Sequence, residues 1–370
     1  MPAPAPSWTL KGVSLTRKEA SLLQSWGCPR EVLHALDFVA QNAGPEESSR
    51  DVEVLDMFCG EKAISGHWSK RGKKASDSKF FCFWLFALGA RAVCQVCVYV
   101  WQSGFLTLLL MVLQMAPDAL GVIGLPCITY IFMNSFTHGR TSDKPYGNES
   151  TREYVKLANV LTVRTVIVIM IMSVRAVYWF VEQPGSSKVI HFPELKHLQK
   201  LIWASGMKTY FQRFWMGSWG APSPKLSMGI SSMPYIDELK TKLTQFERAK
   251  LSSKGIAIVK VLPCGKKTVS GGPALRKTQI YPSGFASKLY DLISKVKAFI
   301  VLVGAVQSYG IKNKFTRTWD HLNLNGEKLW SRISPTGRFD GHCCLGKKYC
   351  RSKSVSCAKF ALAGQTWLRA

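Results

Sequence analysis

Two short motifs place a thiol and a carboxyl directly after apolar runs. Cys127 ends a Gly-Leu-Pro-Cys turn that follows Leu120–Ile123, and Glu182 begins a Glu-Gln-Pro turn that follows Val177–Val181. A cysteine at the edge of a sheet becomes a nucleophile where positive charge or a helix N-terminus lowers the pKa of its thiol. A glutamate at the same edge can hydrogen-bond a nucleobase and protonate a ring nitrogen. Taken one at a time, a buried structural cysteine and a surface turn acid are the simpler explanations.

A third motif has the residue types of a nucleotide-binding turn. Asp56, Phe58 and Gly60 belong to an Asp-Met-Phe-Cys-Gly segment at the end of another apolar run. A glycine there lets a ligand approach the backbone closely, and a helix that starts just afterwards offers free N–H donors. Asp77 follows at about 20 residues, the spacing at which an acid can reach a ribose from the tip of the second strand. A strand–turn–helix unit without a ligand is the alternative.

Two further groups are weaker candidates. His138 and Arg140 follow the Cys127 turn and could line a substrate cleft, although a solvated loop accounts for them equally well. Cysteines gather near the end of the chain with one histidine, and such residues can bind zinc. Their spacing matches no strong zinc pattern, so we predict no metal site. The residues of this group are His342, Cys343, Cys344, Cys350 and Cys357.

Strands and helices are predicted to alternate around these motifs. The predicted strands are Val52–Phe58, Leu120–Ile123 and Val177–Val181, and the predicted helices are Lys62–Arg71 and Ser150–Val174. Alternation of this kind is typical of an α/β fold, here a Rossmann-like, mostly parallel sheet with helices on both faces. Ligands bind beyond the carboxyl ends of the strands in such sheets, which is where all three motifs fall.

Composition divides the chain into three parts. We predict an N-terminal helical and linker segment over 1–50, an α/β domain over 51–295 with an apolar insert at 80–102, and a basic, cysteine-containing extension over 296–370. The chain has 49 Lys and Arg against 23 Asp and Glu, a net charge of +26. Such an excess favours a polyanionic partner, either nucleic acid or an anionic membrane surface.

The surroundings of the protein are also suggested by composition. Eleven cysteines without a disulfide spacing, and the absence of a secretory signal at the start, favour a reducing compartment, nuclear or cytoplasmic. Three windows are long enough to span a bilayer: Phe80–Trp101, Gly104–Ile123 and Val160–Val181. Buried core elements explain the last two. For Phe80–Trp101, a membrane span, a buried or partner-facing helix and an extraneous insert all remain open.

The order of the motifs resembles the cytosine-C5 family of S-adenosylmethionine (SAM) dependent methyltransferases. Asp-x-Phe-x-Gly, a second acid, Pro-Cys and Glu-x-Pro follow one another, each at a strand end. The chain is also similar to methyltransferase-like proteins of dinoflagellate algae. That similarity covers Val54–Gly60, Pro126–Arg140, Tyr178–Ser187, Phe214–Lys225 and Ile280–Phe285.

The resemblance implies a class I methyltransferase-like sheet, SAM as cofactor and nucleic acid, DNA or RNA, as partner. Cys127 would attack C6 of a flipped-out cytosine and Glu182 would stabilise the ring nitrogen. The residues that would border the cofactor are Asp56, Phe58, Gly60 and Asp77. Leu125, Ile128 and Gln183 differ from the residues usual in that family. A non-catalytic relative that binds nucleic acid, and a membrane-associated protein, are the alternatives.

Overall fold

The fold is described from a computed structural model of the chain. It covers residues 13–43, 49–57, 62–78, 96–127, 129–131, 135–251, 257–265, 267–271, 278 and 280–308, with the backbone alone at 77–78, 96–103, 135–136, 257–259, 267–271 and 302–308. The chain divides into two compact units, 1–296 and 297–370. The second unit is described only over 297–308, the last part of helix α10 (Ser283–Ser308).

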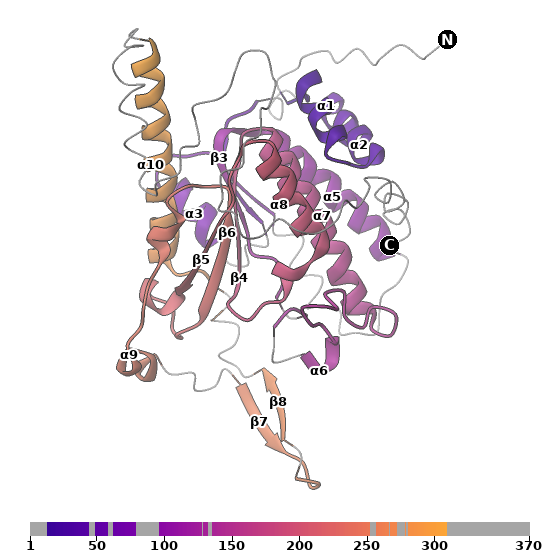
Figure 1. Cartoon of the computed structure of the whole chain (residues 1–370), viewed down its shortest axis with the longest axis vertical. Helices are drawn as coiled ribbons and strands as arrows, with labels where there is room; N and C mark the ends of the chain where they lie inside the picture. The colour runs from indigo at the N-terminus through magenta and orange to yellow at the C-terminus, as the bar shows by residue number, and fades with distance from the viewer. Residues whose placement is uncertain are drawn as a thin grey trace, which may run out of the picture. The chain divides into compact units, whose positions relative to one another are not determined.

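A six-stranded sheet forms the centre of the first unit (Figure 1). Its strands are β1 (Val52–Met57), β2 (Ala75–Ser78), β3 (Met115–Ile123), β4 (Tyr178–Pro184), β5 (Tyr210–Trp215) and β6 (Leu226–Ser231). They lie in the order β2-β1-β3-β4-β6-β5. The first four pair in parallel, and β6 is antiparallel to both β4 and β5. The predicted mixed α/β fold with a mostly parallel sheet is therefore confirmed.

Helices cover both faces of this sheet. On one side lie α1 (Arg17–Ser25), α2 (Arg30–Gln41), α5 (Val96–Leu113), α7 (Glu153–Val174) and α8 (Pro193–Ala204); on the other lie α3 (Ala63–Ser69) and α10 (Figure 1). Successive strand residues alternate between the two apolar layers. Trp179 and Val181 belong to the layer under α7, whereas Phe180 packs with Phe214 and Phe285 under α10.

The remaining elements are short. They are α6 (Ser135–His138), α9 (Gln245–Lys250), the 3-10 helices η3 (Val189–His191), η4 (Met216–Trp219) and η5 (Ile236–Leu239), and a hairpin of β7 (Ala257–Val261) and β8 (Lys267–Gly271). The short helix α6 lies in the segment between β3 and α7, toward the lower end of Figure 1.

Strand β3 is longer than predicted, because it begins at Met115 and the apolar run predicted a start at Leu120. Its pairing with β1 changes register between Val52 and Val54, and Asp118 adopts a left-handed φ of 59° just after Pro117. A bulge of this kind accommodates a proline, which cannot donate to the ladder, near the start of a strand. The apolar residues 120–123 then enter regular parallel pairing beside β1.

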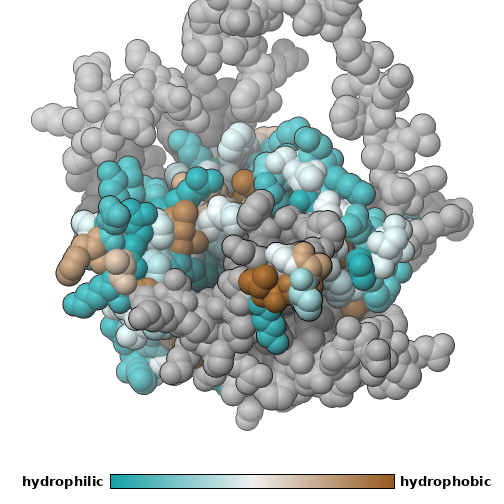
Figure 2. Space-filling view, turned by 90° about the horizontal axis from the view of Figure 1, so that it is seen from below, coloured by the Kyte–Doolittle hydropathy of each residue, from teal (hydrophilic) through white to brown (hydrophobic). Residues whose placement is uncertain are grey.

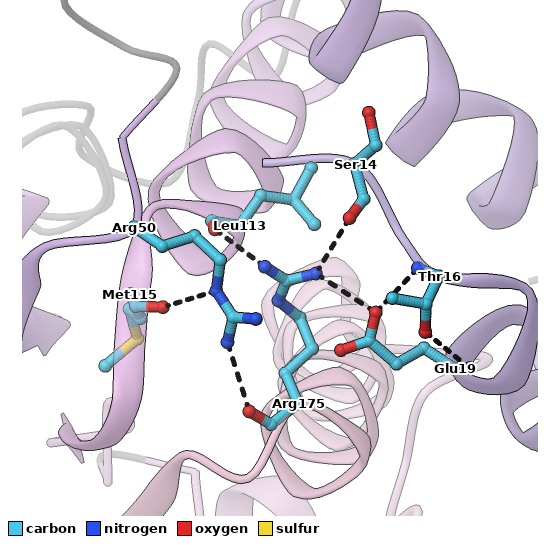
Figure 3. A network of polar contacts seen from close by, with 7 residues as sticks. All are labelled: Ser14, Thr16, Glu19, Arg50, Leu113, Met115 and Arg175. Carbon is cyan, nitrogen blue, oxygen red and sulfur yellow. Dashed lines mark hydrogen bonds and ion pairs between the residues drawn. The ribbon is translucent and has the colours of Figure 1, made fainter. Parts of the chain in front are cut away.

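The N-terminal helices join the same core as the sheet, because Leu23 and Leu36 pack in the layer under α7. A buried arginine links them to it (Figure 3). The guanidinium of Arg175, just after α7, donates to the carbonyl of Leu113 at 3.0 Å and lies 3.6 Å from the carboxylate of Glu19. Glu19 also closes a capping box with Thr16 at the start of α1.

The membrane predictions are answered in part. Among the described residues, α7 is the one helix long and apolar enough to cross a bilayer, and 67% of its most apolar window is buried inside the protein. The window Gly104–Ile123 forms the end of α5 and strand β3, both in the core. The prediction that core elements explain these two windows is therefore confirmed. Of Phe80–Trp101, residues 80–95 lie outside the described residues, and its three interpretations stay predictions.

Candidate functional site

The candidate site lies at the carboxyl ends of β1 and β3, where the order of strands in the sheet changes direction. From β1 the chain passes to β2 on one side and later to β3 on the other, so the topological switch point lies between β1 and β3. The amide of Gly124 donates to the carbonyl of Met57 at 3.1 Å and keeps the two strand ends together. Ligands of open α/β sheets bind beyond the carboxyl ends at this point.

Cys127 lies directly beyond β3 in a turn stabilised by backbone hydrogen bonds. Its carbonyl accepts the amides of Tyr130 at 2.8 Å and Ile131 at 3.2 Å. The thiol is free and half-buried. Burial raises the pKa of the Cys127 thiol above its ordinary value; the positive charge of Lys225 lowers this pKa and the negative charge of Glu182 raises it. The two opposing charges thus both act on the candidate nucleophile.

Gln183 fixes that turn against the end of β4. Its Nε2 donates to the carbonyl of Leu125 at 2.5 Å, and its Oε1 accepts the hydroxyl of Ser187 at 2.9 Å. The side chain is fully buried. Gln183 therefore links the Pro-Cys turn to the end of β4, next to Glu182.

Glu182 is buried and receives hydrogen bonds or ionic contacts from three side chains. Oε1 accepts the hydroxyl of Ser227 at 2.6 Å and lies 3.3 Å from Nζ of Lys225. Oε2 accepts the hydroxyl of Tyr281 at 3.3 Å. Strand β6, which is antiparallel to β4, supplies Ser227 in register with Pro184. The antiparallel strand β6 thus supplies a hydrogen-bond donor to the carboxylate at the end of the parallel strand β4.

Tyr281 interacts with residues that the sequence predicted for the site. It precedes α10 and packs at 5.4 Å, centroid to centroid, against Phe285. Its pKa is raised well above the ordinary value, first by burial and then by the negative charges of Glu182 and Asp56, with Cys127 contributing. Residues from β1, the β3 turn and β4 therefore all act electrostatically on this one hydroxyl. Ile280–Phe285 is one of the segments of resemblance in the sequence, and no residue pattern there predicts a function for Tyr281.

Asp56 accepts a hydrogen bond from the backbone of helix α3. It is fully buried, and its Oδ2 accepts the amide of Ser65 in α3 at 3.1 Å. In the parallel register of β1 and β2, Asp56 is paired with Asp77, so the two predicted acids lie side by side at adjacent strand ends. Phe58 and Gly60 lie outside the described residues, and their role stays a prediction.

His138 and Arg140 are buried beside the Cys127 turn. The ring of His138 contacts the carbonyl of Ile131 through Nε2 at 3.0 Å and accepts the amide of Arg140 through Nδ1 at 3.0 Å. Burial lowers the pKa of His138. Both side chains are buried, so the alternative prediction that they lie in a solvated loop is wrong.

Arg140 makes the larger set of contacts. It donates to the carbonyl of Pro145 at 2.5 Å and to Oδ1 of Asn159 at 2.7 Å, and its guanidinium lies 4.2 Å from the ring centroid of Tyr130. These contacts tie the segment after Cys127 to α7. They give Arg140 a structural role, and contact of either residue with a substrate stays a prediction.

The lower face of the molecule is predominantly hydrophilic where residues are coloured, with hydrophobic atoms in small separate groups (Figure 2).

In the described part of the chain, no group of three or more His, Cys, Asp or Glu could hold a metal ion. The zinc-type residues 342–357 lie outside it. A scan against protein-family models finds no match, and a search of curated proteins finds none either.

Proposed function

We propose that this protein is a SAM-dependent methyltransferase-like protein that acts on nucleic acid from the carboxyl edge of its sheet. The observation that supports the proposal best is the hydrogen bond from the hydroxyl of Tyr281 to Glu182 at 3.3 Å, at a position where Asp56 and Cys127 also raise the pKa of that hydroxyl. Asp56, Cys127 and Glu182 come from three chain segments, at the ends of β1, β3 and β4.

Each residue takes the role expected of a cytosine-C5 methyltransferase. The Cys127 thiolate adds to C6 of a base taken out of its stack. Glu182 holds the polar edge of that base, and Lys225 stabilises the Cys127 thiolate by its positive charge. Gln183 keeps the turn of Cys127 aligned with β4 through the carbonyl of Leu125.

The residues at the tips of β1 and β2 suit the cofactor that the resemblance implies. Paired in register, Asp56 and Asp77 place two acids at adjacent strand ends, the position from which a carboxylate accepts ribose hydroxyls. Asp56 itself is buried and accepts the amide of Ser65 in α3, which leaves the ribose to Asp77. When bound there, SAM would supply an electrophilic methyl group.

Charge supports the choice of nucleic acid as partner. Within the net charge of +26, residues 248–290 contain nine Lys and Arg and no Asp or Glu. The β7–β8 hairpin lies in this stretch and ends at Gly271, before Tyr281 in sequence. A basic segment of this kind would bind phosphates without sequence preference and with a strong dependence on salt.

Methyl transfer from labelled SAM to DNA and RNA tests the proposal. We expect wild type to transfer label, Cys127→Ala to transfer none, and Cys264→Ala, which removes an exposed cysteine of the hairpin turn, to match wild type. Equal transfer by Cys127→Ala and wild type would remove the covalent mechanism.

Calorimetry with SAM tests the cofactor separately. Asp77→Asn should weaken binding, whereas Asp118→Asn, the same change near the start of β3, should not. If wild type does not bind SAM, the protein is not an enzyme of this class.

A non-catalytic relative is the second candidate, and the raised pKa of the Cys127 thiol favours it. It predicts binding of nucleic acid that weakens steeply with salt, together with no binding of SAM. Affinity that does not change between low and high salt would count against it.

A further inference from the structure

The last strand of the sheet carries aromatic and arginine side chains in alternation. Strand β5 ends the order β2-β1-β3-β4-β6-β5. Successive side chains of a strand point to opposite faces, so Phe211, Arg213 and Trp215 share one face of β5. Phe214 points to the other face and packs under α10. Phe211 is 49% exposed, and the guanidinium of Arg213 lies 5.9 Å from the centroid of its ring.

Helix α9 continues this surface. The guanidinium of Arg248 lies 5.5 Å from the centroid of the Trp215 ring, so α9 packs beside the end of β5. Phe246 is 78% exposed, and α9 contains no buried residue. Packing in the core therefore does not explain this phenylalanine. Together with Phe211 and Arg213, these three residues form an aromatic–arginine stripe.

The position of α9 is fixed by residues on both sides of it. Leu243 and Leu251, which flank the helix, pack against η4: a Cβ atom added to Gly217 would lie 3.1 Å from Cδ1 of the first and 2.5 Å from Cδ1 of the second. The amide of Trp215 donates to Oγ1 of Thr241 at 2.9 Å. The flanks are thus anchored, whereas the residues of α9 itself stay exposed.

The stripe lies next to the candidate site. One strand, β6, separates β5 from β4, so the ends of these two strands are about 10 Å apart, twice the spacing of neighbouring strands. Trp215 is in register with Leu226. The amide of Met216 donates to the carbonyl of Lys225 at 2.9 Å, and the ammonium of Lys225 lies 3.3 Å from Glu182. A nucleotide chain with one base at Glu182 can therefore place neighbouring bases on the stripe.

The chemistry of the stripe suits bases that are free of a duplex. Aromatic rings and guanidinium planes are the groups on which unpaired bases stack, whatever their sequence. Bases inside a duplex are stacked on one another and offer no such face. Charge favours nucleic acid as well, because residues 240–250 contain four Lys and Arg against one acid. That acid, Glu247, is engaged in a capping box with Thr244.

We propose that the aromatic–arginine stripe binds the bases next to the target base by stacking, so that the substrate is a single-stranded nucleic acid. This inference rests on the proposed function, because it takes nucleic acid as the partner. The exposure of Phe211 and Phe246 and the placing of Arg248 over Trp215 carry it.

Fluorescence anisotropy of the full chain with labelled oligonucleotides tests the inference. The probes are single-stranded DNA, single-stranded RNA of the corresponding sequence and the DNA duplex. We expect Phe246→Leu and Phe211→Leu each to weaken binding of the single strands by at least about fivefold, the effect of losing one base stack, and binding of the duplex by less than about twofold. Phe38→Leu, at a 58% exposed position in α2, is the matched control and should leave every affinity unchanged.

Salt separates stacking from charge. Lys250→Met in α9 removes one positive charge and should reduce the slope of log affinity against log salt by about 0.7 for a single strand. Phe246→Leu should leave that slope unchanged, because a lost stack releases no counterion. Circular dichroism of each variant checks that it is folded.

The outcomes separate the inference from the proposed function. If Phe246→Leu and Phe211→Leu bind single strands as wild type does, or lose affinity for the duplex to the same extent, stacking on the stripe is excluded and nucleic acid remains the partner. If folded wild type binds none of the probes, the partner in the proposed function is wrong and the inference fails with it. Neither SAM nor Cys127 takes part in this measurement, so an inactive enzyme would not hide the result.

Discussion

The hydroxyl of Tyr281 donates a hydrogen bond to Oε2 of Glu182 at 3.3 Å, although 99 residues separate the two in the chain. The bond joins the segment before α10 to the carboxyl end of β4. Tyr281 is buried in the apolar layer with Phe285, so its hydroxyl reaches the carboxylate from the interior of the domain. The C-terminal part of the domain therefore contributes to the candidate site as well as to the core.

Removing that hydroxyl should have a measurable cost. In Tyr281→Phe, the Glu182 carboxylate loses one donor, and we expect the free energy of unfolding to fall by about 1 kcal/mol, as for other single buried hydrogen bonds. Urea denaturation measures the change. Tyr235→Phe, which removes a more exposed hydroxyl, is the matched control. Equal losses in the two variants would mean that the contact with Glu182 contributes nothing to stability.

The charges around Cys127 predict opposite shifts in two variants. Lys225 lowers the pKa of the thiol and Glu182 raises it. The pH at which iodoacetamide alkylates Cys127 at half its maximal rate should therefore rise in Lys225→Met and fall in Glu182→Gln. Mass spectrometry of the Cys127 peptide follows the reaction. Shifts in the same direction would contradict the arrangement of charges, and the exposed Cys264 provides an internal reference.

Gly284 is required for α10 to pack beside η4. A Cβ atom at this position would lie 2.6 Å from the carbonyl oxygen of Trp219, which belongs to the backbone and cannot rotate away. We expect Gly284→Ala to lower the free energy of unfolding by about 1–3 kcal/mol, as overpacking does elsewhere. Gly66→Ala in α3 has open space around it and should be neutral or slightly stabilising. Thermal unfolding of both variants makes the comparison.

The buried contacts of Arg140 should contribute strongly to the free energy of unfolding. Arg140→Met would leave the carbonyl of Pro145 and Oδ1 of Asn159 without their donor and remove the contact with the Tyr130 ring. We expect a loss of about 3 kcal/mol in urea denaturation. Arg152→Met, at an exposed position before α7, should change little. A small effect at Arg140 would show that the segment adjusts without it.

Glu19 holds the N-terminal helices through Arg175. Burial and then the charge of Arg50 lower the pKa of Arg175, which the charge of Glu19 raises, and the net pKa is about 10. In Glu19→Gln the capping box persists, because glutamine also serves at this position. Only the charge is lost, and we expect about 2 kcal/mol less stability. Glu31→Gln, in the first turn of α2, is the control, and an equal effect there would exclude a specific role for the ion pair.

Local patterns determined much of the fold. The apolar runs at Val52, Leu120 and Val177 predicted β1, β3 and β4 within a few residues, since a strand buried on both faces reads as a continuous apolar segment. Polar residues just after those runs indicated the edge on which Asp56, Cys127 and Glu182 lie. No comparable pattern predicted β5 and β6, whose strands carry mixed polar and aromatic residues.

By itself, then, the sequence determined the α/β class, the strand ends and the candidate nucleophile and acid, because these depend on neighbours in the chain. Tertiary structure alone decided that Lys225, Ser227 and Tyr281 surround Glu182, and that His138 and Arg140 are buried instead of solvated. Those contacts join residues from separate elements. Whether a carboxylate meets an ammonium or water depends on packing between distant segments, which no local pattern encodes.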